Sequence, residues 1–188
     1  MIRPMDRTAL FIDAGYLDKL CQEVFGVPSG GRKIPLALNF KQLPAALADA
    51  KPWKTFYYHC LPYQDDPPLP AQFAAREAKK RFLGFIGILK GWELREGRLE
   101  KRGDSYIQKR VDVLLAVDLT RLAWRQEIKQ AVLVSGDADF VPAVEDARAA
   151  GVHVTLRYAP GTAHADLVAA CNAARPLTRE GLEAIRLT

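Results

Sequence analysis

Short apolar runs of strand length alternate along this chain with longer segments of helical periodicity. The apolar runs cover residues 8–12, 55–58, 131–134 and 152–156. The helical segments cover residues 16–25, 71–86, 111–125, 140–150 and 165–173. Strands that alternate with helices favour a mainly parallel sheet with helices on both of its faces. We therefore expect an α/β fold.

Two further local patterns predict structure between these elements. Residues 92–95 and 98–101 are strand-like and lie on either side of Glu96 and Gly97, which predicts a hairpin or another strand pair. Asn39 can cap a short helix that runs through about Ala50.

Length and composition limit the class of protein. The chain has 188 residues, of which 49% are hydrophobic and 26% charged, a balance that suits one globular domain with one ordinary core. We expect a single domain over residues 1–188, with its core at about 8–158 and C-terminal helices within 163–186. No apolar run approaches the roughly 20 residues that span a bilayer, and the first residues lack a signal-peptide layout.

The cysteines carry information about the cellular compartment. They are three in number and far apart, with no CxxC spacing: Cys21, Cys60 and Cys171. This pattern indicates buried thiols in a reducing cytoplasm and makes a structural zinc site an unlikely reading. We expect a cytoplasmic protein that does not associate with membranes.

Aspartates follow two of the predicted strands at the point where each strand ends. Asp13 comes directly after the first strand, and Asp137 follows residues 131–134 after only Ser135 and Gly136. Asp13 and Asp137 can be ordinary turn residues, and Asp139 can be a helix N-cap. If the two strands are neighbours, however, repulsion between the carboxylates is unfavourable unless a cation neutralises it. Oxygen ligands without His or Cys suit Mg²⁺ or Mn²⁺.

Two more aspartates lie in the helical segment that begins near residue 111. Asp112 falls at its start, where capping is the rival explanation, and Asp118 is six residues further on. At 3.6 residues per turn, the two side chains lie roughly 120° apart around the helix, so they cannot easily reach one metal from the same face. We favour Asp112 as a metal-site carboxylate. Asp118 either supports the site or is structural.

Positive charge is concentrated in one part of the chain. Between Arg76 and Arg110 there are eleven Lys or Arg residues and five Asp or Glu residues, a local net charge of +6 against +5 for the whole chain. A solvated helix face and a surface that attracts phosphate are both compatible with this segment. Because this segment leads directly into Asp112, it favours the surface that attracts phosphate.

Other catalytic patterns are weak in this sequence. The histidines show no metal-ligand spacing: His59, His153 and His164. There is no GxSxG elbow around Ser135 and no GxxxxGK[ST] phosphate loop.

Three segments together resemble the signatures of NYN-domain proteins, in the bacterial branch also called LabA-like or DUF88. They are residues 11–17 (FIDAGYL), residues 109–113 (KRVDV) with Asp118, and residues 134–140 (VSGDADF). The resemblance implies a three-layer α/β/α PIN-like fold and a metal-dependent ribonuclease. The acidic set that it implies is Asp13, Asp112, Asp137 and Asp139, with Asp118 as a further catalytic candidate. The first signature usually has Asn where this chain has Tyr16, so a polar contact near the metal is missing or supplied elsewhere.

The mechanism that the resemblance implies is hydrolysis of RNA phosphodiester bonds with Mg²⁺ or Mn²⁺ as cofactor. Lys101, Arg102, Lys109 and Arg110 would contact phosphates and give salt-sensitive affinity. Tyr16 and Tyr106 would stack on unpaired bases of single-stranded RNA, although ordinary packing explains either tyrosine as well.

Two other functions remain open at this point. One is a regulatory RNA- or nucleotide-binding module with a weak or inactive site, which the Tyr16 substitution favours. The other is a metal-dependent phosphohydrolase acting on a small phosphoester. That class would normally have a DxD spacing after the first strand, whereas this chain has Gly15. A homo-oligomer or a protein partner is compatible with everything above.

Overall fold

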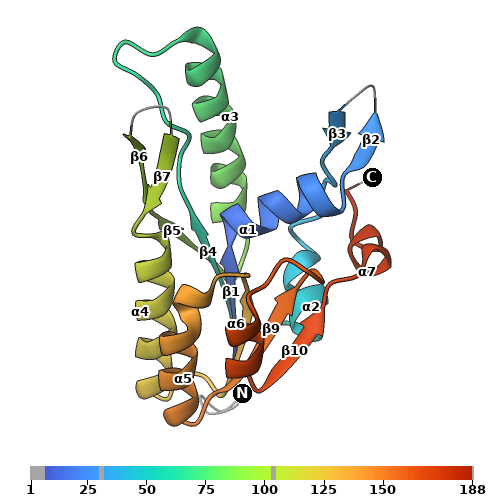
Figure 1. Ribbon diagram of the computed structural model, residues 1–188, viewed down its shortest axis with the longest axis vertical. Coiled ribbons are helices and arrows are strands. Elements are labelled where there is room, and N and C mark those ends of the chain that lie inside the picture. The colour runs from blue at the N-terminus through green and yellow to red at the C-terminus, as the bar shows by residue number, and fades with distance from the viewer. Residues whose placement is uncertain (1–6, 30–31, 103–104, 188) are drawn as a thin grey trace.

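The centre of the molecule is a sheet of six strands (Figure 1). The structure is a computed structural model that describes residues 7–29, 32–102 and 105–187, except for the side chains of residues 28, 29, 32 and 100–109. The strand order is β10-β9-β8-β1-β4-β5, and each neighbouring pair is parallel. The strands are β1 (Thr8–Asp13), β4 (Lys54–His59), β5 (Trp92–Glu96), β8 (Gln130–Val134), β9 (His153–Tyr158) and β10 (Ala173–Pro176). The expectation of a mainly parallel sheet is confirmed.

Helices cover both faces of this sheet, which completes the three-layer α/β/α arrangement expected from the sequence (Figure 1). The α-helices are α1 (Ala14–Lys19), α2 (Leu43–Ala48), α3 (Pro70–Gly87), α4 (Val111–Trp124), α5 (Val141–Ala149), α6 (Ala165–Ala170) and α7 (Arg179–Glu183). A π-helical segment, η2 (Leu20–Val24), continues α1, and a 3-10 turn, η3 (Ala138–Phe140), precedes α5.

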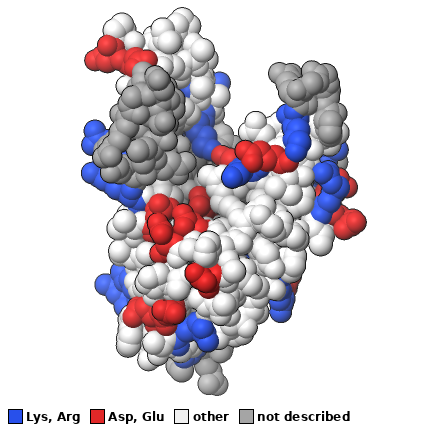
Figure 2. All heavy atoms as spheres, viewed as in Figure 1, with Lys and Arg blue, Asp and Glu red and all other residues white. Residues whose placement is uncertain are grey.

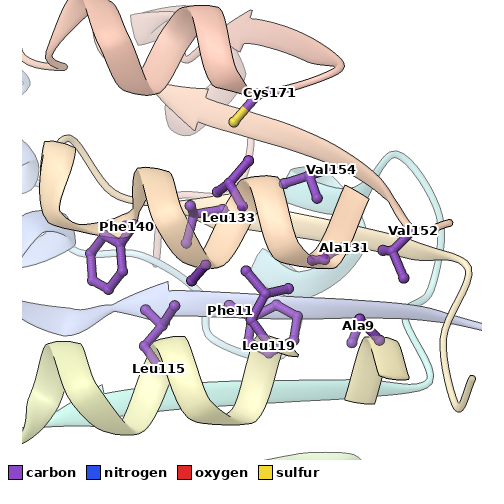
Figure 3. Packing of buried hydrophobic residues seen from close by; sticks show 14 of the residues in the cluster. Ala9, Phe11, Leu115, Leu119, Ala131, Leu133, Phe140, Val152, Val154 and Cys171 are labelled. Carbon is purple, nitrogen blue, oxygen red and sulfur yellow. The ribbon is translucent and has the colours of Figure 1, made fainter. Parts of the chain in front are cut away.

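The alternation of side chains along β1 shows how the two layers are specified. Ala9 and Phe11 point to the face covered by α4, α5 and α6, whereas Leu10 and Ile12 point to the face covered by α1, α2 and α7. All four are completely buried. Figure 3 shows Leu115 and Leu119 of α4 directed toward the sheet beside Phe11. Because both faces of β1 are buried, its sequence is an uninterrupted apolar run.

The direction in which strands are added reverses at β1. From β1 the chain moves outward on one side through β4 and β5, and from β8 it moves outward on the other side through β9 and β10. In open parallel sheets, ligands bind at the carboxyl ends of the strands beside such a reversal. In this protein the reversal lies between β1 and β8, and Asp13 and Asp137 follow these two strands.

The predicted hairpin at residues 92–101 is wrong. β5 instead joins the central sheet, with Trp92 opposite Thr55 of β4, because α3 returns the chain as a parallel crossover. The chain leaves the sheet at Gly97, whose N–H donates to the carbonyl of His59. β6 (Arg98–Arg102) then pairs with β7 (Ser105–Lys109) in a separate antiparallel hairpin, and a second hairpin joins β2 (Val27–Ser29) and β3 (Arg32–Ile34).

Smaller differences concern the helix boundaries. α6 ends at Ala170, and the residues after it form the edge strand β10, so the C-terminal region is not purely helical. Gln42 rather than Asn39 precedes α2, while the Asn39 carboxamide accepts a hydrogen bond from the N–H of Lys41. Among the residues described, none of the helices combines the length and apolar composition needed to cross a bilayer.

Candidate functional site

Asp13 ends β1 and caps α1 at the same time. Its Oδ1 accepts hydrogen bonds from the N–H groups of Gly15, at 2.9 Å, and Tyr16, at 3.2 Å. A buried apolar strand followed at once by a capping aspartate is what places this carboxylate at the sheet edge. The main chain orients Asp13, and lone pairs on Oδ2 remain able to accept further contacts.

Asp137 has an equivalent place after β8. Its Oδ1 accepts a hydrogen bond from the N–H of Asp139 at 3.0 Å, and its own N–H donates to Oγ of buried Ser135 at 3.3 Å. Since Ile12 and Val134 are paired in register, the segments that follow β1 and β8 leave the sheet side by side. Asp13 and Asp137 line one pocket of about 420 Å³. We call this the acidic pocket.

Asp112 and Asp139 stand close enough to influence the same carboxylates. Burial raises the pKa of Asp13 from 3.8 to about 6, and repulsion from Asp112 and Asp137 adds to this shift. The pKa of Asp112, in the first turn of α4, is raised by partial desolvation and then by Asp137 and Asp139. The structure therefore brings together four of the aspartates singled out from the sequence. Figure 2 shows acidic side chains gathered on this face, over the region where α4 and α5 begin.

The donor set of this cluster suits a hard cation, although the side chains do not form a complete cage. Among the described residues, no three His, Cys, Asp or Glu side chains are arranged so that they could hold a metal ion together. Mg²⁺ is usually bound by one or two carboxylates together with water and substrate phosphate oxygens. Asp13 and Asp137, two carboxylates at strand ends that repel each other, fit that mode. The remaining ligands of the cation would come from solvent and substrate.

Asp118 lies elsewhere and has other partners. It is buried, accepts a hydrogen bond from the Tyr58 hydroxyl at 3.1 Å, and forms salt bridges to Arg95, at 2.8 Å, and Arg121. A carboxylate neutralised by two guanidinium groups is poorly suited to cation binding. Of the two roles left open by the sequence, the geometry supports the structural one. A catalytic role for Asp118 remains a prediction, and these contacts do not favour it.

Tyr16 forms part of the wall of the acidic pocket. Its hydroxyl accepts a hydrogen bond from the N–H of Ala159 and shares another with Oγ1 of Thr162, so it ties α1 to the loop after β9. The ring lies against Gly136, where an added Cβ would come within 2.7 Å of Tyr16 Cε2 and 2.3 Å of the Thr162 carbonyl oxygen. These contacts favour packing over base stacking for Tyr16, and they explain why residue 136 must lack a side chain.

The residues expected to contact RNA can be placed only in part. Arg110 is exposed and immediately precedes α4, in a left-handed backbone conformation with φ of 74°. The side chains of the other four lie outside the part that the structure describes: Lys101, Arg102, Tyr106 and Lys109. Their predicted contacts remain predictions.

Two further residues of the acidic pocket escaped the sequence reasoning. Lys19, on α1, and His164, at the start of α6, both line it. Lys19 could have been found, because it lies four residues after Gly15 and hence on the same helical face. His164 had no local signal. Its N–H donates to the Gly136 carbonyl, a contact that exists only in the folded chain.

Comparison with known protein families shows to which family this chain is related. The model of the NYN domain matches residues 7–178. The chain belongs to the NYN-domain family. NYN domains are part of the PIN-like nuclease superfamily, so the family indicates a nuclease, a hydrolase for which RNA is the implied substrate.

A solved structure supports the fold. The crystal structure of VPA0982, a protein of unknown function from Vibrio parahaemolyticus, is similar to this chain with a TM-score of 0.65 over 100% of both chains. At 17% sequence identity, this similarity supports the fold alone. No curated protein matches the chain in sequence.

Proposed function

We propose that this NYN-domain protein is a Mg²⁺- or Mn²⁺-dependent ribonuclease that hydrolyses phosphodiester bonds at the acidic pocket. The observation that carries the proposal is the convergence of four carboxylates at the point where the strand order reverses. Uncompensated repulsion at this position destabilises the fold, and such electrostatic conflict is typical of functional sites. Asp13, Asp112, Asp137 and Asp139 would hold the cation.

The bound cation would supply Lewis-acid polarisation of the phosphate and a lowered pKa for an attacking water. The chain's own residues provide orientation and proton transfer. Backbone N–H groups fix Oδ1 of Asp13 and of Asp137. Both main-chain hydrogen bonds of Asp13 go to Oδ1, so its Oδ2 is the oxygen that would accept the proton of the water.

The positive charges at the pocket would bind the substrate backbone. Lys19 lines the pocket and Arg110 lies beside Asp112, so each can approach a phosphate oxygen while the carboxylates act on its neighbour. The acidic pocket, at about 420 Å³, has a size that suits a single nucleotide. We therefore propose single-stranded RNA as the substrate. The three free thiols fit a reducing cytoplasm, and the motifs fit the LabA-like branch.

The decisive experiment is cleavage of an end-labelled single-stranded RNA with Mn²⁺, with Mg²⁺ and with chelator. We expect metal-dependent cleavage by the natural protein and none by Asp137→Asn, which keeps the size of the side chain and can still accept from the N–H of Asp139. The matched control is Asp146→Asn on α5, where a carboxylate oxygen accepts a hydrogen bond from Trp124 away from the pocket. Equal, chelator-resistant cleavage by all three proteins would contradict the proposal.

The alternative is a regulatory module that binds RNA or a nucleotide without cleaving it. It is favoured by the incomplete cation cage among the described residues and by Tyr16, whose hydroxyl is already bonded to the loop after β9. This alternative would be established if the natural protein binds Mn²⁺ and binds RNA in a salt-sensitive way, yet never cleaves the RNA.

A further inference from the structure

A second concavity lies on the other side of α1. It has a volume of about 1070 Å³ and shares no lining residue with the acidic pocket. Its walls come from α1 and η2, from residues 35–41, and from α3, including Leu17, Leu38, Ala75, Ala78 and Phe85. In Figure 1, α3 and the β2–β3 hairpin rise on either side of α1, and Figure 2 shows the surface hollowed between them. We call this concavity the apolar groove.

The helix that forms one wall of the groove is barely covered by the rest of the protein. Of the 18 residues of α3, only Leu83 and Ile86 are buried. Phe73 and Phe85 are 54% and 42% exposed, and Ile88, just beyond the helix, is 81% exposed. Since most helical stability in proteins comes from packing an apolar face, an uncovered helix of this length indicates a surface that another molecule covers.

The floor of the groove consists of aromatic rings packed against one another. Phe40 and Phe82, which both line it, pack edge to face with ring centroids 5.0 Å apart. Tyr57 of β4 packs beneath them, at 6.0 Å from Phe40 and 6.3 Å from Phe82. Binding therefore requires little ordering of the groove itself, which is typical of sites that accept a partner as they stand.

The charges around the groove narrow the kind of partner. Lys41 and Lys79 line it, and Lys79 lies 3.1 Å from its single acidic neighbour in the lining, Asp18. The exposed face of α3 adds Lys80 and Arg81. Two copies of α3 facing each other would bring like charges together, which opposes a homodimer through this helix.

We propose that the apolar groove binds an amphipathic helix of a protein partner, with one apolar face and acidic residues along its flanks. The apolar face would occupy the groove between α3 and residues 35–41. The acidic flanks would meet Lys41 and would compete with Asp18 for Lys79, which form a salt bridge with each other. This proposal is independent of the nuclease assignment, because the groove and the acidic pocket have no residue in common.

The test uses two designed peptides as probes with the full-length protein. Both are fluorescein-labelled amphipathic helices with the same Leu and Phe positions, and they carry either Glu or Lys on the flanks. We expect the Glu-flanked peptide to bind about tenfold more tightly at low salt, with the difference reduced at high salt. Lys41→Glu should reduce or reverse this preference.

Variants of the groove wall then locate the binding site. Ala78 is exposed on α3 and lines the groove. Ala78→Glu should therefore lower the affinity for the Glu-flanked peptide by about tenfold or more, while the melting temperature stays unchanged. The control is Val117→Glu, an exposed position on α4 outside the groove, which should bind normally. RNA cleavage should be the same in Ala78→Glu as in the natural protein.

Three outcomes would overturn the proposal. The first is equal binding of both peptides, or binding that Ala78→Glu leaves intact. The second is RNA binding that Ala78→Glu abolishes, which would make the groove an RNA surface. The third is a concentration-dependent dimer, seen by light scattering, that Ala78→Glu converts to monomer.

Discussion

The acidic pocket and the apolar groove lie on opposite sides of one short helix and differ in almost every physical respect. The pocket is small, and its carboxylates are positioned by hydrogen bonds to the adjacent main chain. The groove is more than twice as large and is built from apolar side chains that are distant in sequence. The pocket stores electrostatic repulsion that a cation can relieve, whereas the groove exposes apolar surface that a partner can cover. The comparison shows that two surfaces of opposite chemistry can lie on the two sides of one helix without sharing a residue.

The largest expected effect separates the two sites completely. Asp137→Asn should reduce RNA cleavage by at least about 100-fold, because a cation ligand is lost, while binding of the Glu-flanked peptide is unchanged. Ala78→Glu should give the opposite pattern. The two assays are run on both variants at equal protein concentration. A loss of both properties in one variant, without a change in its melting temperature, would show that the sites are coupled.

A smaller effect is expected from adding one methyl group to a glycine of the acidic pocket and one to a glycine of α3. Gly136→Ala, in the pocket, would place Cβ at 2.3 Å from the Thr162 carbonyl oxygen, so the backbone must shift. We expect a loss of about 1–3 kcal/mol in the free energy of unfolding and lower activity.

The matched substitution is Gly84→Ala on α3, the helix that forms one wall of the groove but whose Gly84 does not line it. An added Cβ there meets no atom within 4 Å, so the higher helix propensity of Ala should stabilise the protein by about 0.5–1 kcal/mol. Urea denaturation of both variants measures the difference. Equal stability changes would contradict the close approach at Gly136.

The pH dependence of the metal-free protein tests the cost of ionising Asp13, which comes first from burial and then from repulsion by Asp112 and Asp137. The pKa of Asp13 is higher in the folded state than its ordinary value of 3.8, so folding favours the protonated form. Ionisation of Asp13 therefore costs stability as the pH rises from about 4 to about 6. Asp13→Asn keeps a capping side chain and should be more stable than the natural protein at pH 7 by on the order of 1–3 kcal/mol.

This gain from Asp13→Asn should vanish at pH 4, where the natural carboxyl is protonated as well. It should also shrink when Mn²⁺ is added to the natural protein, because ligand binding stabilises the folded state. Thermal melts in chelator across this pH range measure the effect. A gain that is the same at pH 4 and pH 7 would point to capping rather than to charge.

A smaller effect than at Asp13 is expected at the contact between α1 and the loop after β9. Tyr16→Phe removes the hydroxyl that accepts from the N–H of Ala159 and bonds to Thr162. We expect a loss of about 1 kcal/mol in stability, with RNA affinity retained because the ring packs against Gly136 and need not stack on a base. A large drop in RNA affinity without a stability change would instead establish Tyr16 as a stacking residue.

The sequence by itself determined the class of fold and the position of the main aspartates at the edge of the sheet. Uninterrupted apolar runs such as β1 can be stable only between two layers, and an aspartate that follows such a strand must lie at its carboxyl end. Asp13 and Asp137 could therefore be found from local patterns, and so could Asp112 at the start of α4.

Only the tertiary structure decided which other groups share that edge and what the remaining surface offers. The role of Asp118 depends on Arg95 and Tyr58, which come from β5 and β4. The parallel placement of β5, which a local hairpin pattern could not reveal, depends on the crossover through α3. His164 enters the pocket through a contact with Gly136, and the apolar groove combines segments from α1 to α3. These features follow from long-range packing, which leaves no periodic signal in the local sequence.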